Sequence, residues 1–241
     1  MAKVTLENLN KIFVSKIGKD VKAVNDFNLL LEDGEILALL GSSGCGKTTT
    51  LRMIAGFETA TSGQIKIGER IVNDLKPADR NVAMAFEGYA LYPPLTVKDN
   101  IAFSLMREKI SKDKVDSKVM EVAELLEITD ILERYPPSIS GGQQQRVSLA
   151  RALVRDSDAL LLDEPMSQLE PQLRAVLRAR VKDYIQHNNK TVIFVTHDQT
   201  EAVALADKIA VMENGDLKQL ASPYEISCLL YTSPSPRDST L

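Results

Sequence analysis

The residues best suited to chemistry lie in the segment GSSGCGKT, which follows the apolar run EILALL and precedes a helical pattern. This order matches the phosphate-loop pattern G-x-x-x-x-G-K-[ST] between a strand and a helix. Glycines let backbone N–H groups face an anion, and a helix N-terminus adds partial positive charge. Lys47 can reach the β and γ phosphates, and the Thr48 hydroxyl can ligate Mg²⁺. The predicted nucleotide contacts are Gly41, Ser42, Ser43, Gly44, Cys45, Gly46, Lys47, Thr48 and Thr49.

An acidic pair ends a second apolar run, in the segment ALLLDEP from Ala159 to Pro165. The four apolar residues predict a short buried strand of a parallel sheet. Asp163 can hold Mg²⁺ through water, and Glu164 can polarise an attacking water. Taken alone, the pair fits an ordinary acidic turn equally well. Beside a phosphate loop, we predict metal binding by Asp163 and catalysis by Glu164.

A histidine ends a third apolar run, TVIFVTHD, from Thr191 to Asp198. A single histidine is more often structural than catalytic. His197, however, ends a predicted strand, and ligands of open α/β sheets gather where parallel strands end. We therefore predict that His197 contacts the γ-phosphate and acts with Glu164 and Lys47 in catalysis.

Glu87 interrupts the apolar run VAMAF and begins a loop that contains the pair Pro93-Pro94. A carboxylate supplies the hard oxygen ligands that Mg²⁺ prefers. Its negative charge near a triphosphate is unfavourable unless a cation is close. We predict that Glu87 meets the metal and the nucleotide. A solvated loop carboxylate is the alternative.

A second glycine-rich helix start occurs in SISGGQQQRVSLARALVRD, where Ser140 precedes Gly141 and Gly142. Such a start is a second geometry suited to an anion. The alternative is a simple N-cap after a loop. The preceding apolar positions of KDKVDSKVMEVAELLEI recur at helical spacing, which predicts one face of a core helix.

The composition limits the class of protein. The chain has 241 residues, 44% of them hydrophobic, with a net charge of −4. This length suits one domain with a subdomain, and this charge gives no reason to expect nucleic-acid binding. The longest apolar runs are too short to cross a bilayer, and no signal sequence is evident. We predict a cytoplasmic protein whose membrane contact goes through a partner subunit, without a structural disulfide at Cys45.

The last segment does not resemble the rest. Permitted codons for CLLYTSPSPRD can spell a transposase adapter that is used in sequencing libraries. We therefore predict that residues 228–241 are a non-native tail and that the gene is truncated near Ile226. A native Pro/Ser-rich disordered tail is the alternative.

The ordered motifs resemble the ATP-binding subunits of ABC transporters over about residues 3–226. GSSGCGKT is similar to the Walker A motif, SISGGQ (through Gln143) to the signature, and ALLLDEP to Walker B, and His197 matches the switch histidine. Phe13 stands where the family has an aromatic that stacks on adenine, although a core Phe is a rival reading. RMIAGFETATSGQIKIG and GYALYPPLTVKDNIAF look most like the maltose-type sugar importers.

This resemblance implies an α/β P-loop NTPase (RecA-like) core, an N-terminal antiparallel β-subdomain and a helical signature subdomain at about residues 92–155. It also implies that two ATPase subunits pair head to tail around ATP and Mg²⁺. Ser140, Gly141, Gly142 and Gln143 of one chain then meet the nucleotide held by the other. Further implied partners are membrane permease subunits and, indirectly, a solute-binding protein, at the cytoplasmic face of a prokaryotic inner membrane. A C-terminal regulatory β-domain of these relatives is missing here, as truncation would explain.

Two positions depart from the family pattern. Glu87 stands where glutamine is usual, and Leu169-Glu170 where Leu-Asp is usual. One hypothesis is that the chain pairs with a paralogous ATPase instead of with itself.

Other functions stay open. The solute is a sugar or polyol by resemblance only, since polyamine and metal importers have similar ATPases. A non-transport ABC ATPase is disfavoured by the short separation of Lys47 from Ser140, which leaves no room for long coiled coils. A nucleotide-binding regulator without turnover is disfavoured by the presence of Lys47, Asp163, Glu164 and His197.

Overall fold

A six-stranded sheet forms the centre of the protein. The computed structural model describes residues 2–14, 18–106 and 110–226, and the predicted non-native tail at 228–241 lies outside them. The strand order is β10-β9-β3-β8-β7-β6, parallel except for the β9–β10 hairpin. The strands are β3 Ile36–Leu40, β6 Val82–Ala85, β7 Ala159–Asp163, β8 Val192–Thr196, β9 Lys208–Glu213 and β10 Asp216–Ala221.

The parallel strands follow from the apolar runs of the sequence. Every residue of β3, β7 and β8 is buried, as expected of parallel strands that are covered on both faces. The β9–β10 hairpin turns at Asn214-Gly215, a pair typical of tight hairpins, and both residues have the positive φ that this turn requires. One sequence-based boundary was wrong: β8 ends at Thr196, so His197 is the first residue after the strand.

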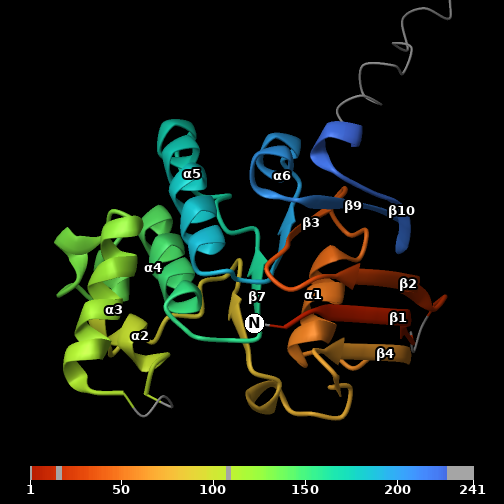
Figure 1. The fold of residues 1–241 in the computed structure, drawn as a ribbon, viewed down its shortest axis with the longest axis horizontal. Helices are drawn as coiled ribbons and strands as arrows, with labels where there is room; N and C mark the ends of the chain where they lie inside the picture. Colours follow the sequence, from red (N-terminus) through yellow and green to blue (C-terminus); the bar gives the residue numbers. More distant parts are fainter. Residues whose placement is uncertain (1, 15–17, 107–109, 227–241) are drawn as a thin grey trace, which may run out of the picture.

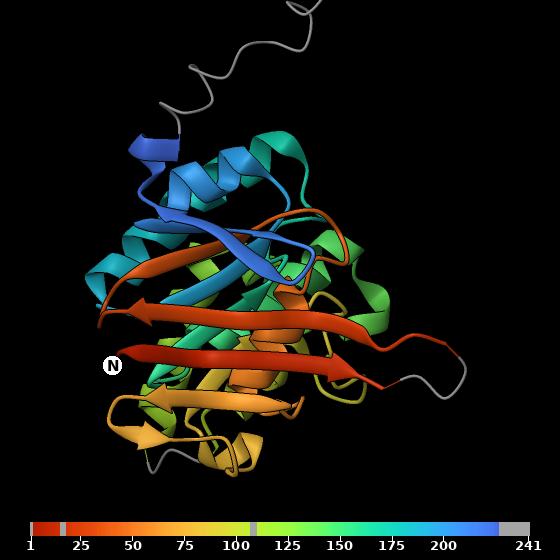
Figure 2. The same ribbon diagram turned by 90° about the vertical axis from the view of Figure 1, so that its right-hand side faces the viewer.

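A four-stranded antiparallel sheet lies beside the central sheet, in the order β2-β1-β4-β5 (Figure 2). It confirms the predicted N-terminal antiparallel β-subdomain. This sheet borders the phosphate loop, because the backbone of Ala23 in β2 lies against Gly46. Its strands are β1 Val4–Phe13, β2 Val21–Leu31, β4 Ser62–Ile67 and β5 Arg70–Ile71.

The helices divide into two groups (Figure 1). Three helices, α2, α3 and α4, gather on the side of the molecule that lies away from β1, β2 and β4, within the interval predicted for the helical subdomain. Helices α5 and α6 cover the central sheet beside them. The helices are α1 Lys47–Ala55, α2 Val97–Phe103, α3 Lys112–Leu125, α4 Gly141–Leu153, α5 Pro171–His187 and α6 Gln199–Leu205, and short 3₁₀ turns occur at Pro77–Asp79, Thr129–Ile131 and Pro136–Ser138.

The central sheet separates two hydrophobic cores. Successive side chains of a strand point to opposite faces. Ile36, Ala38 and Leu40 of β3 therefore join the core under the helices, whereas Leu37 and Leu39 join the core under the antiparallel sheet. The strand that leads into the phosphate loop is thus held from both sides.

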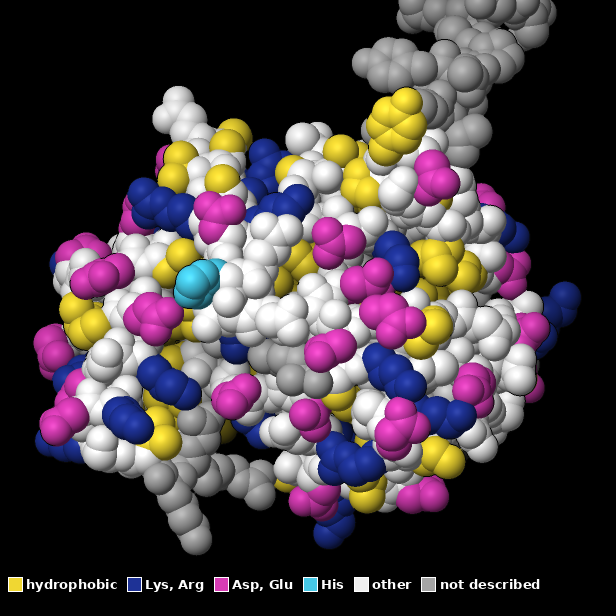
Figure 3. Space-filling model, in the orientation of Figure 1, with side chains coloured by type: hydrophobic (Ala, Val, Ile, Leu, Met, Phe, Trp, Pro, Cys, Tyr) yellow, Lys and Arg dark blue, Asp and Glu magenta, His cyan; other side chains and the backbone are white. Residues whose placement is uncertain are grey.

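The charged side chains and the apolar character of the helices bear on whether this chain could cross a bilayer. Acidic and basic side chains are mixed over the described part of the face in Figure 3. Among the described residues, none of the helices combines the length and the apolar character that a bilayer crossing requires.

A buried guanidinium joins the α1 C-terminus to the loop before β6. Arg80 is 3% exposed, and it donates hydrogen bonds to the backbone oxygens of Met53, Ile54, Leu75 and Asn73 at 2.7–3.0 Å. Burial lowers the pKa of Arg80. The planar fork satisfies carbonyls that the end of a helix leaves without partners.

We expect Arg80→Lys to lower the free energy of unfolding by about 2 kcal/mol, because one ammonium group cannot reach all four carbonyls and leaves buried acceptors unpaired. Urea unfolding followed by circular dichroism measures the change. Arg70→Lys is the control, since Arg70 is half exposed and pairs with Asp158 at the surface. Equal losses for the two variants would contradict the role assigned to Arg80.

Candidate active site

The phosphate loop connects β3 to α1 and depends on glycine at two points. Gly44 has φ +81° and Gly46 has φ +108°, in the left-handed region. A Cβ at Gly46 would lie 2.2 Å from the backbone oxygen of Ala23 in β2. Gly46 is also the N-cap of α1 and provides no side-chain cap. The first N–H groups of α1 are therefore available to an anion.

Lys47 is folded into this loop. Its Nζ donates to the backbone oxygens of Gly41 at 2.8 Å and Ser42 at 2.9 Å, and lies 3.8 Å from Cys45 Sγ. The side chain is 6% exposed. Cys45 is buried and has a free thiol. The loop thus holds an ammonium group beside the helix N-terminus, as the binding of a phosphate requires.

Thr48 and Asp163 meet across the gap between α1 and β7. Thr48 Oγ1 donates to Asp163 Oδ1 at 2.9 Å. Burial is the main cause that raises the pKa of Asp163; the Thr48 hydrogen bond acts in the opposite sense, and the charges of Glu87 and Glu164 raise it further. Negative charge is therefore concentrated at this edge of the sheet.

Glu164 and His197 form the second contact pair. His197 Nδ1 lies 3.0 Å from Glu164 Oε1, with the imidazole 65% and the carboxylate 14% exposed. The hydrogen bond and the charge of Glu164 raise the pKa of His197. Glu164 has φ +49°, which a residue with a side chain adopts only when its surroundings hold it.

One cavity of about 500 Å³ joins these groups. Glu87, which follows β6, lines the same cavity as Lys47, Thr48 and Glu164. Sequence reasoning had placed these residues at one edge, and the structure brings them together. The complete lining is Ala23, Ser43, Gly44, Gly46, Lys47, Thr48, Thr49, Glu87, Glu164, Ser167, Gln168, Val195 and His197.

The other predicted contacts are not among the residues that line this cavity: Asp163, Gly41, Ser42 and Cys45 beside the phosphate loop, and Phe13, Ser140, Gly141, Gly142 and Gln143 elsewhere. Phe13 is 41% exposed at the end of β1, with Lys11 Nζ 4.7 Å from its ring centroid. Ser140 caps α4: its Oγ accepts from Gln143 N, and Gln143 Oε1 accepts from Ser140 N at 2.9 Å. Gly141 and Gly142 begin the helix. The N-cap alternative is thus realised, and the N-terminus of α4 still offers N–H groups.

Gln145 is a residue of the site that sequence reasoning missed. It lies on α4 yet reaches the loop after Glu164, where Nε2 donates to Glu164 O at 2.9 Å and Oε1 accepts from Gln168 N at 2.9 Å. It is 3% exposed. The available signal was its helical spacing from Ser148, Leu149 and Ala152, which are also buried, since a polar residue on a buried stripe needs partners.

Glu170 occupies the N-cap of α5 without a side-chain hydrogen bond to the helix. Aspartate is favoured at an N-cap because its shorter side chain reaches the N–H groups of the first turn. Glu170 therefore leaves the N-cap of α5 without a side-chain hydrogen bond. Arg174 instead donates to the backbone oxygens of Ser167 and Leu169 at 3.1 and 2.9 Å.

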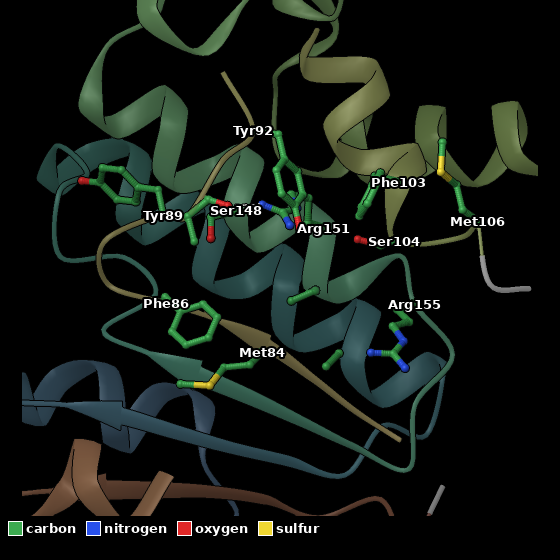
Figure 4. Close-up of a pocket in the computed structure, with 13 residues that line it drawn as sticks. Met84, Phe86, Tyr89, Tyr92, Phe103, Ser104, Met106, Ser148, Arg151 and Arg155 are labelled. Atoms are coloured by element: carbon green, nitrogen blue, oxygen red, sulfur yellow. Dashed lines mark hydrogen bonds between the residues drawn. The ribbon is translucent and has the colours of Figure 1, made fainter. Parts of the chain in front are cut away.

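A separate groove of about 320 Å³ lies between the end of β6 and the helices α2 and α4 (Figure 4). Arg151 lies against the Tyr92 ring, 5.0 Å from its centroid, and donates to Ala90 O at 2.7 Å. Tyr89 and Ala90 both have positive φ. The loop that begins at Glu87 thus runs from the cavity to this groove, and its backbone is held by Arg151.

The donors at Thr48 and Asp163 are of the kind that holds Mg²⁺ together with phosphate oxygens and water. Among the described residues, no three His, Cys, Asp or Glu side chains are arranged to hold a metal ion. Mg²⁺ is commonly bound by one or two carboxylates together with substrate phosphates and water. The Thr48 hydroxyl and the Asp163 carboxylate, 2.9 Å apart beside the phosphate loop, fit that donor set.

Comparison with known proteins gives one family. Residues 24–167 match the ABC transporter family. MalK, the trehalose/maltose import ATP-binding protein of Thermococcus litoralis, is 49% identical over 94% of this chain and 61% of its own length. UgpC, the sn-glycerol-3-phosphate import ATP-binding protein of Brucella abortus, is 43% identical over 98% of this chain and 65% of its own. XacK, the xylose/arabinose import ATP-binding protein of Haloferax volcanii, is 43% identical over 93% of this chain and 59% of its own length.

A solved structure gives the same fold. The dimeric ATP-binding cassette MJ0796, in a post-hydrolysis state bound to ADP and Pi, superposes with a TM-score of 0.84 at 27% identity. The match covers 91% of this chain and 98% of that one. By contrast, the chain spans about three fifths of the length of the curated relatives it matches.

We expect the pKa of His197 to lie above its usual value of about 6.5 and to fall in Glu164→Gln, because the neutral amide cannot stabilise the imidazolium. Below the raised pKa the ring is cationic; above it the ion pair is lost. NMR titration of the imidazole in a His187→Gln background, which leaves one histidine, measures this. An unchanged pKa in Glu164→Gln would mean that the pair does not persist in solution.

Proposed function

We propose, from the premise that this chain belongs to the ABC transporter family, that it is the ATP-hydrolysing subunit of an importer for a sugar or polyol. The observation that carries this proposal is the cavity that gathers Lys47, Thr48, Glu164 and His197 at the ends of parallel strands. The solute class is supported by relatives that serve trehalose/maltose, glycerol-3-phosphate and xylose/arabinose import.

The phosphate loop would hold the β and γ phosphates of ATP. The fit rests on the left-handed glycines, the uncapped start of α1 and the buried ammonium of Lys47. Residues 41–49 form this cradle, and Phe13 supplies an aromatic face for the base. Its exposed ring suits stacking.

Thr48 and Asp163 would hold Mg²⁺, with Glu87 as a further oxygen donor that lines the same cavity. The ion neutralises negative charge that develops on the phosphate oxygens. Burial is the main cause that raises the pKa of Asp163, and the charges of Glu87 and Glu164 add to it, so a cation here would also offset the negative charge of the three carboxylates.

Glu164 would orient the attacking water and accept a proton from it as the water oxygen bonds to the γ phosphorus. The bond from that phosphorus to the β–γ bridging oxygen breaks, and ADP leaves. His197 holds the Glu164 carboxylate at 3.0 Å and would contact the γ-phosphate. Lys47 balances charge on the transferred group.

A head-to-tail pair of ATPase subunits would complete each site. Ser140, Gly141, Gly142 and Gln143 lie at the start of α4, outside the residues that line the cavity, and would meet the nucleotide held by the second chain. The dimeric state of the MJ0796 cassette supports this arrangement. The second chain would be a copy of this chain or a paralogue; the hypothesis of a paralogue rests on the departures at Glu87 and Glu170, and Glu170 makes no side-chain hydrogen bond at the N-cap of α5.

The groove at Tyr92 and Arg151 would receive a segment of a membrane permease subunit. The loop that begins at Glu87 connects this groove to the nucleotide cavity. A permease segment in the groove and a nucleotide in the cavity would therefore both contact this loop. The ATPase would thereby sit at the cytoplasmic face of the membrane.

Glu164→Gln should lower kcat for ATP by about 10² to 10⁴ while leaving ATP binding in place, because the amide cannot accept the proton. The variant should accumulate as an ATP-bound dimer, which size-exclusion chromatography detects. Phosphate release by the purified chain measures the rate. Hydrolysis by Glu164→Gln at the wild-type rate would remove the role assigned to the carboxylate.

Glu87→Gln should raise the half-saturating Mg²⁺ concentration of the ATPase by about threefold, the size expected from one exposed carboxylate near the ion. It should also change the stimulation of ATPase by reconstituted permease. Glu69→Gln is the control, because Glu69 is 89% exposed and pairs with Lys3 away from the cavity. An unchanged Mg²⁺ dependence and unchanged coupling would favour the solvated loop carboxylate.

A further inference from the structure

Gln145 connects the N-terminal half of α4 with the loop that follows β7 and contains Glu164. Its amide lies between α4 and the loop after β7, and three hydrogen bonds hold it there. Nε2 donates to Glu164 O at 2.9 Å and to Ser167 Oγ at 3.1 Å, while Oε1 accepts from Gln168 N at 2.9 Å. Both ends of the amide are therefore used.

The bridge lies in the packed interior of the protein. Gln145 is 3% exposed, and Val147, Ser148, Leu149 and Ala150 after it are also buried. An unpaired amide at such a position is costly. A shift of α4 therefore carries the loop with it or breaks buried hydrogen bonds.

The acceptor is the backbone of the predicted catalytic residue itself. Glu164 has φ +49°, and its carbonyl oxygen accepts from both Gln145 Nε2 and Ser167 Oγ. Its own N–H donates to Val195 O at 3.1 Å. These bonds hold a backbone conformation that is unfavourable for a residue with a side chain, and thus set the direction of the carboxylate.

The opposite end of this link is the N-terminus of α4. Ser140, the N-cap of this helix, and the two glycines that begin it lie about one turn before Gln145. Under the proposed function, on which this inference rests, that end meets the nucleotide held by the partner chain. Glu164 serves the nucleotide held by its own chain.

We propose that Gln145 is a positioning residue that couples the two ATP sites of the dimer: nucleotide contact at the N-terminus of α4 sets the backbone of Glu164 at the other site. Occupation of one site then changes hydrolysis at the other, because a small shift of α4 moves the water-activating carboxylate. A displacement of the order of 1 Å at such a group costs up to about 10²-fold in rate.

The test is Gln145→Met in the full chain, which keeps the length of the side chain and removes its hydrogen bonds. ATP hydrolysis is measured against ATP concentration. We expect kcat to fall at least about tenfold, half-saturating ATP to stay within about twofold, and the Hill coefficient to drop from above one to near one. A purely structural role would not separate these quantities.

Gln144→Met is the matched control. Gln144 is the neighbouring residue on α4, and its Nε2 donates to Pro136 O and Ile139 O instead of to the Glu164 loop. We expect Gln144→Met to keep its kcat within about twofold and to keep its Hill coefficient. Where Gln145→Met does not fold, as judged by its melting curve, Gln145→Glu takes its place, since it keeps an oxygen for Gln168 N and loses the donor to Glu164 O.

The outcomes separate the inference from the proposed function. Absence of ATP hydrolysis in the wild-type chain and in the reconstituted importer would reject the proposed function. An active wild type with an unchanged kcat in the Gln145 variant would reject only the inference. Equal losses in the Gln144 and Gln145 variants, or a wild-type Hill coefficient of one, would also overturn it.

Discussion

The register of the parallel sheet is the constraint on which the site depends. Leu40 pairs with Thr196, Val195 with Asp163, and Leu162 with Ala85, so β3, β8, β7 and β6 end almost level with one another. The residues that follow each strand therefore meet at one edge. Parallel strands buried on both faces cannot shift by one residue without exchanging their two cores. The packing of apolar side chains thus fixes the distances between the polar ones.

This constraint explains why so much could be predicted from the sequence. Four short apolar runs, each followed by a polar residue, were enough to place Lys47, Glu87, Glu164 and His197 at one edge, because the ends of parallel strands meet. The conformation of the phosphate loop could be predicted from its glycines, because Gly44 and Gly46 adopt the positive φ that glycine favours. The antiparallel and helical parts came from the resemblance, since their periodicity alone does not decide how they are arranged.

The features that could not be predicted depend on contacts between distant segments. Nothing local to Gln145 shows that its amide reaches Glu164, because the partner lies in another element. Likewise, the four carbonyls around Arg80 come from the end of α1 and the segment between β5 and β6. The lack of a side-chain cap at Glu170 can be predicted from the sequence only when the first residue of α5 is known. Side-chain hydrogen bonds to backbone thus join elements that the hydrophobic pattern identifies separately.

The contact between Gly46 and Ala23 has a consequence for how this fold can change over time. The backbone of β2 fills the space where any side chain at position 46 would stand. Accepting a methyl group there would require the Ala23 backbone of β2 to move away from the loop. Position 46 is therefore restricted to glycine, and substitutions elsewhere in the two sheets are compatible with the loop where they leave this space unchanged.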